Sequence, residues 1–185
     1  MAQQYSYISD LIRQFIEKQK VFFVATAMET GHINVSPKGM DSLRVLGPNR
    51  VVWLNVTGSG NETATHVQHS PRMTLMFCAF EGTPSILRLY GESRVIHVGE
   101  MGWKELAQHF PSIPGARQIF DVQISLVQTS CGMAVPLFDY VEDRDLLWNW
   151  AEKKGEQGIH TYWEEKNQTS IDGVASNILE KARIE

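Results

Sequence analysis

The sequence predicts a mainly β protein: an antiparallel β-barrel with helical additions at its N-terminal and C-terminal ends. Six or so short runs rich in β-branched and aromatic residues lie between Gly, Pro and Asn turn signals. Helical spacing of apolar residues is confined to the two ends and a few short connections. Helices do not alternate with strands, as a doubly wound parallel sheet would require. The length of 185 residues suits one core.

The strand segments are separated by recognisable turns. Gly31 lies in the turn of a first hairpin, Gly-Pro-Asn-Arg joins a second strand pair, and Gly91 is where the longest strand is expected to bend. The last strand alternates apolar and polar residues, which is typical of a half-buried strand. The predicted strands cover residues 21–28, 33–37, 42–46, 51–55, 72–80, 85–98 and 120–130.

Helices are predicted where apolar residues recur at positions three and four apart. Either Ser6 or Ser9 can cap the first of them, and Pro71 follows the second. The two helices after the last strand are expected to end at Gly155 and Asn167. The predicted helices cover residues 7–19, 62–68, 101–110, 143–155 and 156–167, with a further turn or two in the tail 170–185.

This order of elements predicts two parts. Residues 1–142 are expected to form the barrel domain with its N-terminal helix, and residues 143–185 to form a helical extension that packs on the barrel. Neither an internal repeat nor a low-complexity segment interrupts the chain.

Charge and cysteine content exclude several classes of function. The net charge of −4 leaves no basic footprint for nucleic acid over the chain as a whole. No apolar run approaches the roughly 20 residues needed to span a bilayer, and the start has no basic-then-apolar leader, so we expect a cytoplasmic protein with no membrane partner. The two cysteines are far apart and lack metal-site spacing, so neither a metal site nor a disulfide framework is predicted.

The segment Asn34–Gly39 gathers hydrogen-bonding groups at a strand break. Pro37 cannot donate to a β-ladder and Gly39 tolerates positive φ, so the strand must end or bulge there. Backbone N–H groups, the Ser36 hydroxyl and the Lys38 cation are then available to a ligand. Taken alone, the segment is explained equally well as a plain turn between strands.

A second polar segment, Leu54–His66, crowds hydroxyl and amide groups beside two glycines at the start of a predicted helix. Helix N-termini attract anions because free N–H groups and the helix dipole converge there. Taken alone, the segment is more simply a polar surface loop that supplies an N-cap. The candidates for phosphate binding are Thr57, Ser59, Asn61 and Thr63.

Four further residues have two interpretations each. Arg72 and Arg88 can hold a phosphate, although a solvated strand face is commoner. Trp53 suits core packing better than ring stacking on a ligand. Cys131 is expected to line a site without being a nucleophile. The six scattered histidines support neither a metal site nor a Ser-His-Asp arrangement.

The segments NVSPKG, VVWLNVTGSGNETATHV, SPRMTLMF and LRLYGESRVI resemble the pyridoxamine 5'-phosphate oxidase family. The SCG and SIDG motifs of the tail resemble one subgroup of it, so the likeness runs from residue 21 to residue 173. The resemblance implies a six-stranded split barrel and a homodimer with two FMN molecules at the subunit interface. It implies an FMN-dependent oxidoreductase that transfers hydride or electrons to or from a small substrate. The alternatives are a non-catalytic flavin- or haem-binding split barrel and a dimeric scaffold that has lost its cofactor.

Carried over residue by residue, the resemblance places the Asn34–Gly39 segment near the isoalloxazine ring and the 53–61 segment along the ribityl chain towards the phosphate. A lysine beside the pyrimidine side of a reduced flavin stabilises its negative charge, so Lys38 is expected to tune the cofactor. No catalytic residue is predicted, and the arginine pattern of the vitamin-processing members has no counterpart here. The predicted cofactor-binding residues are Asn34, Ser36, Pro37, Lys38, Gly39, Trp53, Leu54, Asn55, Thr57, Ser59, Gly60, Asn61, Thr63 and Cys131.

Overall fold

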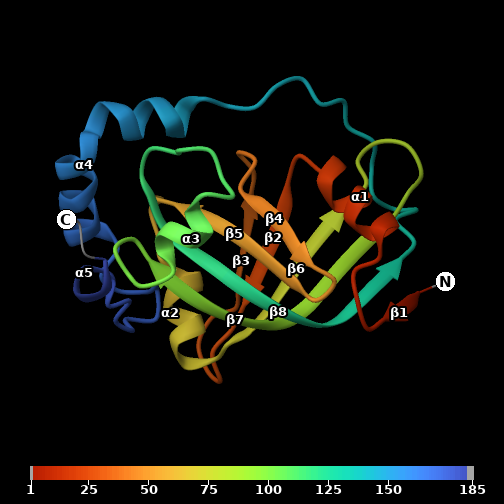
Figure 1. The fold of residues 1–185 in the computed structure, drawn as a ribbon, viewed down its shortest axis with the longest axis horizontal. Helices are drawn as coiled ribbons and strands as arrows, with labels where there is room; N and C mark the ends of the chain where they lie inside the picture. The colour runs from red at the N-terminus through yellow and green to blue at the C-terminus, as the bar shows by residue number, and fades with distance from the viewer. Residues whose placement is uncertain (1, 183–185) are drawn as a thin grey trace.

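Eight strands form one continuous sheet among residues 2–182, the part of the chain that this computed structural model describes (Figure 1). They are β1 (Gln3–Tyr5), β2 (Phe22–Thr26), β3 (Asn34–Lys38), β4 (Leu43–Gly47), β5 (Arg50–Val56), β6 (Arg72–Cys78), β7 (Ile86–His97) and β8 (Ala116–Ser130). The sheet order is β3-β2-β6-β7-β8-β5-β4, with β1 paired to β8, and every pairing is antiparallel. The predicted fold class, an antiparallel split barrel with helices at both ends, is confirmed, although the described sheet has eight strands and not the six that the resemblance implied.

The barrel is split between β3 and β4. These strands are consecutive in the chain, yet they occupy the two ends of the sheet order, so the described strands leave the barrel open there. Strand β1 was not predicted, because the residues Gln3–Tyr5 carry no hydrophobic alternation and are all exposed. Pro37 is tolerated within β3 because β3 is an edge strand.

The long pair β7 and β8 bends as Gly91 predicted. The register shifts between Tyr90 and Gly91, because Ser125 of β8 is an extra residue opposite this point. A Cβ atom at Gly91 would overlap the backbone carbonyl of Gln123. Glycine is therefore required here by the close approach of two strands.

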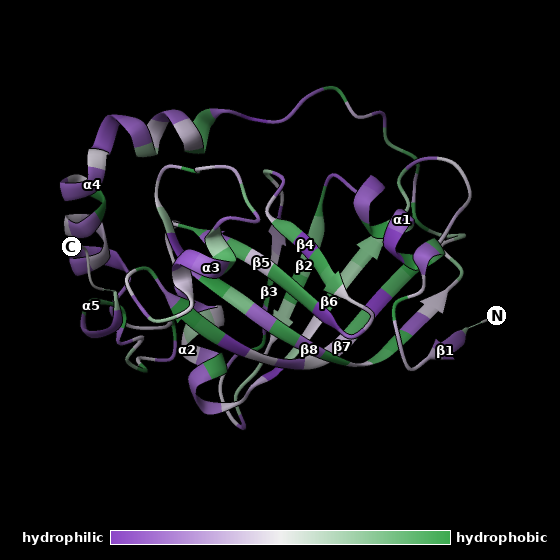
Figure 2. Cartoon of the chain, in the orientation of Figure 1, coloured by the Kyte–Doolittle hydropathy of each residue, from purple (hydrophilic) through white to green (hydrophobic). Residues whose placement is uncertain are grey.

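The core lies inside the curved sheet, whose apolar faces are the green stretches in Figure 2. The rings of Trp53 and Phe120 stack at 4.3 Å between centroids, and Phe22 stacks on Phe77 at 5.8 Å. Aromatic pairs of this kind add to the free energy gained from burial. The first pair packs β5 against β8 and the second packs β2 against β6, and the end of the β5–β8 pair carries part of the site described below.

Five helices surround the sheet among the described residues. They are α1 (Asp10–Lys18), α2 (Glu62–His69), α3 (Trp103–Ala107), α4 (Leu146–Lys166) and α5 (Ile178–Lys181). Ser9 caps α1 by accepting a hydrogen bond from the Ile12 N–H. Helix α3 is shorter than predicted because Gly102, with φ of 93°, precedes it in a non-helical conformation.

The C-terminal extension returns to the end of the barrel at which β8 begins. Residues 131–145 lead without regular structure from the far end of β8 to α4 (Figure 1). Helix α4 is broken at Gly155 (φ 63°, ψ 175°), which agrees with two predicted helices ending at Gly155 and Asn167. Its buried residues Ile159 and Trp163 pack with Ile178 of α5. No described helix has both the length and the apolar character needed to cross a membrane.

Candidate functional site

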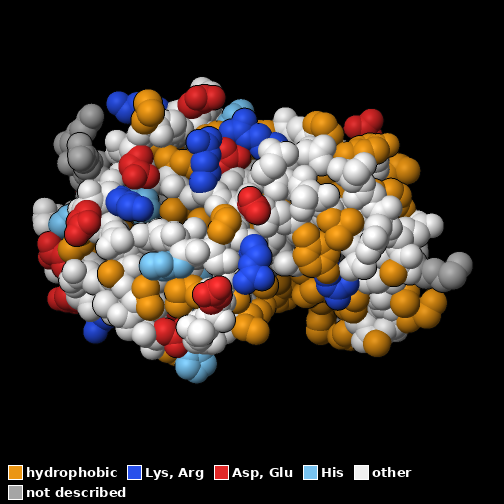
Figure 3. All heavy atoms as spheres, turned by 90° about the horizontal axis from the view of Figure 1, so that it is seen from below, with side chains coloured by type: hydrophobic (Ala, Val, Ile, Leu, Met, Phe, Trp, Pro, Cys, Tyr) orange, Lys and Arg blue, Asp and Glu red, His pale blue; other side chains and the backbone are white. Residues whose placement is uncertain are grey.

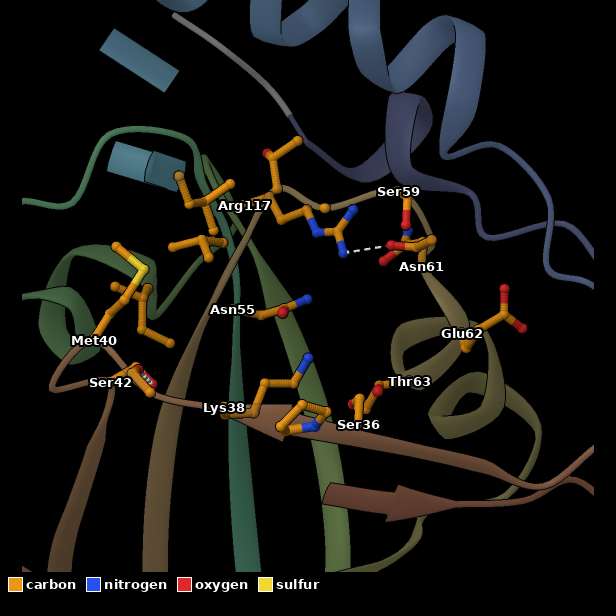
Figure 4. A pocket seen from close by; sticks show the side chains of 18 of the residues that line it. Ser36, Lys38, Met40, Ser42, Asn55, Ser59, Asn61, Glu62, Thr63 and Arg117 are labelled. Atoms are coloured by element: carbon orange, nitrogen blue, oxygen red, sulfur yellow. Dashed lines mark hydrogen bonds between the residues drawn. The ribbon is translucent and has the colours of Figure 1, made fainter. Parts of the chain in front are cut away.

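A cavity of about 410 Å³ lies at the split of the barrel, between β3 on one side and the end of β5 on the other (Figure 4). The 39–42 connection, the loop after β5, the first turn of α2 and the start of β8 complete its walls. Its lining consists of Asn34, Ser36, Pro37, Lys38, Gly39, Met40, Ser42, Leu54, Asn55, Val56, Thr57, Gly58, Ser59, Gly60, Asn61, Glu62, Thr63, Arg117 and Leu147.

The structure brings the two predicted polar segments to this one cavity. Every residue predicted to bind the cofactor lines it, except Trp53 and Cys131. The two segments meet because β3 and β5 lie on opposite sides of the split, and the loop after β5 leads directly into α2. Seven lining residues are not among the predicted cofactor-binding residues: Met40, Ser42, Val56, Gly58, Glu62, Arg117 and Leu147.

Trp53 and Cys131 lie elsewhere in this chain. The Trp53 side chain is fully buried in the core, and its ring centroid lies 5.4 Å from Nζ of the lining residue Lys38. Cys131 is exposed just beyond the far end of β8, roughly 40 Å of strand away from Arg117. A contact between Cys131 and such a site would require the cavity of a second copy of the chain. Arg72 and Arg88 also lie outside the lining.

The loop after β5 is held by hydrogen bonds from three directions. Thr57 donates both its N–H and its hydroxyl to the Gly115 carbonyl, each at 2.8 Å. The Trp163 indole N–H donates to the Thr57 hydroxyl at 2.8 Å, and the Asn167 amide donates to the Gly58 carbonyl at 3.0 Å. The C-terminal extension therefore fixes the shape of a loop that the barrel domain supplies.

The side-chain amide of Asn61 is buried at the N-terminal end of α2 without a hydrogen-bond partner among the described residues. Asn61 precedes α2 at the N-cap position, but its side chain does not cap the helix. The Ser36 hydroxyl is buried and unpartnered as well. Because unsatisfied buried polar groups cost free energy, such groups around one cavity indicate a polar ligand.

Asn34 links the cavity to the barrel interior. Its side-chain N–H donates to the hydroxyls of Thr63, at 3.1 Å, and Thr26, at 3.3 Å. Thr26 also lies 3.1 Å from Nδ1 of the buried His66. This network fixes the Asn34 side chain, so that β3 and the first turn of α2 keep a constant spacing.

Two cations project into the cavity from opposite walls, Lys38 from β3 and Arg117 from β8, with Asn55 between them (Figure 4). Neither makes an ion pair among the described residues. Burial, with a smaller contribution from the positive charge of Arg117, lowers the pKa of Lys38 to about 8. Burial likewise lowers the pKa of Arg117 to about 10, against a small opposing effect of Tyr162. Both remain cationic at neutral pH.

Arg117 is the most informative residue that sequence analysis missed. It is 4% exposed, and its guanidinium donates to the Asn167 side-chain oxygen and to the Gly60 carbonyl, both at 2.7 Å. Its Nε is buried and unpartnered. A signal was present in the sequence, since a long cation opens an otherwise apolar strand, but the surrounding Pro and Gly residues favoured a simple chain break.

The only carboxylate among the described lining residues, that of Glu62, does not compensate these cations. Glu62 points away from Lys38 and Arg117 in Figure 4 and accepts the Ile171 N–H at 3.0 Å. The described residues contain no group of three or more His, Cys, Asp or Glu side chains that could hold a metal ion. The cavity is thus a partly open, cationic site with spare hydrogen-bonding groups.

Two comparisons of the sequence with known proteins identify the same family. The sequence model described as pyridoxamine 5'-phosphate oxidase matches residues 8–131. The chain is 36% identical over 188 residues to the pyridoxamine 5'-phosphate oxidase family protein ustO of Aspergillus flavus, a match that covers 92% of this chain and 76% of that protein.

Solved structures share the fold at low sequence identity. A single-residue variant of HupZ from Group A Streptococcus aligns with a TM-score of 0.54 at 18% identity over 66% of this chain and 99% of the other. A provisionally assigned pyridoxamine 5'-phosphate oxidase from Lactobacillus delbrueckii aligns with a TM-score of 0.52 at 18% identity over 66% of this chain and 94% of the other. These likenesses concern the split-barrel fold.

Proposed function

We propose that this chain, which belongs to the pyridoxamine 5'-phosphate oxidase family, is a flavoprotein that binds FMN in the cavity at the barrel split and serves as an oxidoreductase for a small substrate. One observation carries the proposal: two buried cations, Lys38 and Arg117, face one cavity without a carboxylate partner among the described residues. A buried uncompensated cation is costly, and an anionic ligand removes that cost.

The residues of the cavity fit a phosphorylated flavin. A volume of about 410 Å³ lies in the range of cofactor pockets. The unpartnered amide of Asn61 and Nε of Arg117 supply donors for phosphate oxygens, beside the backbone N–H groups at the start of α2. The phosphate would therefore lie between the 57–61 loop and Arg117.

The ring system would lie at the opposite end of the cavity, along β3. There Asn34 and Ser36 offer an amide and a hydroxyl, and Lys38 offers a cation. When bound, FMN supplies hydride or electron transfer. The chain's own contribution is to hold the ring, to exclude water with the apolar side chains of Leu54 and Val56, and to place the Lys38 charge beside it.

We further propose that the protein is a homodimer and that a second copy covers the open side of the cavity. Apolar side chains gather at the right-hand end of the molecule in Figure 3, which supports an association surface there. Large apolar residues that are more than half exposed also follow β8 and lie on β3 or just before it. They include Ile33, Val35, Met133, Leu137, Phe138 and Val141.

A haem-binding protein without turnover is a weaker alternative. Haem iron is usually held by His, Cys, Tyr or Met side chains. Among the described lining residues, Met40 is the only one of these types. The cationic and amide groups are better matched to a phosphate than to an iron ligand.

The visible spectrum of the purified protein tests the proposal. We expect flavin absorption bands and release of FMN, identified by mass, on heating. A Soret band would replace the proposal with the haem alternative, and colourless protein that takes up no added FMN would reject cofactor binding. For the holoprotein, reoxidation of the photoreduced cofactor by a panel of acceptors would show whether the protein turns over and with which class of substrate.

A further inference from the structure

We infer that Asn167, in the C-terminal extension, is the positioning residue for Arg117, so that the docking of the extension and the binding of the ligand's phosphate are coupled. This inference rests on the proposed function, because it names how that site is assembled. Asn167 lies beyond residues 8–131, which match the family model, so the extension supplies a part of the site that the matched region lacks.

Asn167 joins three segments through one side chain and its own carbonyl. The side chain is fully buried; its oxygen accepts from the Arg117 guanidinium at 2.7 Å, and its nitrogen donates to the Gly58 carbonyl at 3.0 Å. The Asn167 carbonyl accepts the Ser176 hydroxyl. One amide thereby sets the position of Arg117 relative to the 57–61 loop. The phosphate is proposed to lie between that loop and Arg117.

The chemistry of an amide suits this task better than that of a carboxylate. Arginine has about 2 kcal/mol of side-chain rotamer entropy, so an unheld guanidinium would not stay aimed at one point. The Asn167 oxygen fixes its direction but carries no charge, so the positive charge of Arg117 remains available to an anion. An aspartate at the same place would fix the guanidinium and also neutralise it, and it would lose the hydrogen bond to the Gly58 carbonyl, because a carboxylate has no N–H to donate.

The extension has further contacts with the same walls, which makes the coupling cooperative. Trp163 donates to Thr57, and Glu62 accepts the Ile171 N–H. The Gln68 side chain of α2 donates to the Ser176 carbonyl at 2.8 Å. If docking of these elements favours phosphate binding, phosphate binding must favour docking by the same factor.

The test compares Asn167→Asp with Gln168→Glu, a matched control that makes the same change in charge at an exposed neighbour. FMN and riboflavin differ by the phosphate, so the ratio of their dissociation constants isolates the contribution of that group. We expect Asn167→Asp to weaken FMN binding about tenfold or more, the size of one charge-assisted hydrogen bond, while riboflavin binding changes less than about twofold. Gln168→Glu should match the wild type for both ligands.

Equal losses for FMN and riboflavin would overturn the inference, because a merely structural role affects both ligands; unchanged affinities for both ligands would also overturn it. Should Asn167→Asp not fold, Arg117→Lys serves instead: it keeps a cation that cannot reach both Asn167 and Gly60, and the same selective loss is expected.

A second readout keeps the inference separate from the proposed function. Inorganic pyrophosphate should raise the melting temperature of the wild type and of Gln168→Glu, and slow proteolysis of the extension, but do neither for Asn167→Asp. If the wild type takes up no flavin, the proposed function fails while this experiment still decides the inference. Absent or equal protection in the wild type and Asn167→Asp would overturn it.

Discussion

Two pairs of cations on the same sheet differ in whether a carboxylate of the chain pairs with them. On its outer surface, Arg50 and Arg94 both bind Asp121, at 2.9 Å and 2.8 Å, and both guanidinium groups are partly exposed. At the barrel split, Lys38 and Arg117 are largely buried and have no carboxylate partner among the described residues. The better solvated pair is thus the one with an internal counter-ion.

The difference shows which cations serve the fold. A cation that stabilises a folded chain is expected to be paired, because a buried unpaired charge costs free energy. Lys38 and Arg117 carry this cost in the chain alone, and the orphaned amide of Asn61 beside them adds to it. Such a cost is typical of a binding site, in which the compensating group belongs to the ligand.

Replacing Arg117 should produce the largest effect on ligand affinity. It is the most direct test of the difference between the buried and the paired cations. For Arg117→Met we expect FMN affinity to fall roughly a hundredfold, since an arginine bound to a phosphate contributes about 2–3 kcal/mol. Riboflavin affinity should change much less. Fluorescence titration with both flavins measures this, and Arg94→Met, on the outer surface, is the control. Equal FMN affinities in the two variants would show that the buried cation is not reserved for the phosphate.

Replacing Asp121 should affect stability and leave the cavity intact. For Asp121→Asn we expect a loss of about 1–2 kcal/mol in the free energy of unfolding, discounted because both arginines are partly exposed. Urea denaturation measures this loss, and FMN affinity should equal that of the wild type. A large loss of FMN affinity would mean that the two cation pairs are not independent.

The dependence of stability on acid pH should distinguish Asp121→Asn from the wild type. Burial raises the pKa of Asp121, but hydrogen bonds from Arg50 and Arg94 outweigh it and lower the pKa below its ordinary value of 3.8. The stabilisation is therefore complete above the ordinary value and is lost as the pH falls through the folded value. The wild type should lose this increment of unfolding free energy in acid, whereas Asp121→Asn should not.

Replacing Lys38 should stabilise the ligand-free protein while weakening the site. Lowering the Lys38 pKa from 10.5 to about 8 corresponds to at most about 3 kcal/mol, and partial solvation reduces it. We expect Lys38→Met to unfold at higher urea near neutral pH. In the wild type, stability should rise between about pH 8 and 10.5, because the unfolded chain still holds a proton that the folded chain has lost.

The affinity of the wild type for FMN should fall in the same alkaline range, as Lys38 loses its charge. Lys38→Met should bind FMN more weakly than the wild type at neutral pH and show no such fall. Identical affinity profiles in the two proteins would exclude Lys38 from the ligand's surroundings. A flavin midpoint potential lower in Lys38→Met than in the wild type would independently support its place beside the ring.

The smallest effect is expected at the pair of His32 and Asp172, which ties the first hairpin to the C-terminal extension with a 2.6 Å contact. A hydrogen bond to Asp172 raises the pKa of His32, so any stabilisation is full below the ordinary value of 6.5 and is lost as the pH rises through the raised value. His32→Ala should lower the melting temperature slightly at about pH 5.5 and not at about pH 9. FMN affinity should not change.

The sequence was sufficient for every described strand except β1, for the positions of the main helices and for both polar segments of the site. Pro37 and Gly39 marked a strand end, and the glycines around Ser59 marked a loop that enters a helix, because backbone restrictions act locally. The break in the C-terminal helix was predicted at Gly155, because a glycine that ends a helix also acts through its own backbone conformation.

Arg117 and its partner could not be found in this way. The contact with Asn167 joins residues 50 positions apart, and it depends on how the extension packs after leaving the far end of β8. Trp53 had two interpretations in the sequence, and only the stack with Phe120 shows that its ring belongs to the core. Local patterns report backbone conformation, whereas the pairing or isolation of a charge is a property of the tertiary structure.

The split of the barrel also leaves the sheet with an exposed edge strand. Strand β3 ends the sheet order, and Val35 on it, with Ile33 just before it, is more than half exposed. An edge strand with exposed apolar side chains is a template onto which another chain can add a strand. Pro37, which offers no N–H to such a partner, limits this growth at one position only. Preparations that lack both the proposed ligand and the proposed dimer partner should therefore precipitate through side-by-side strand association while their sheet is still intact.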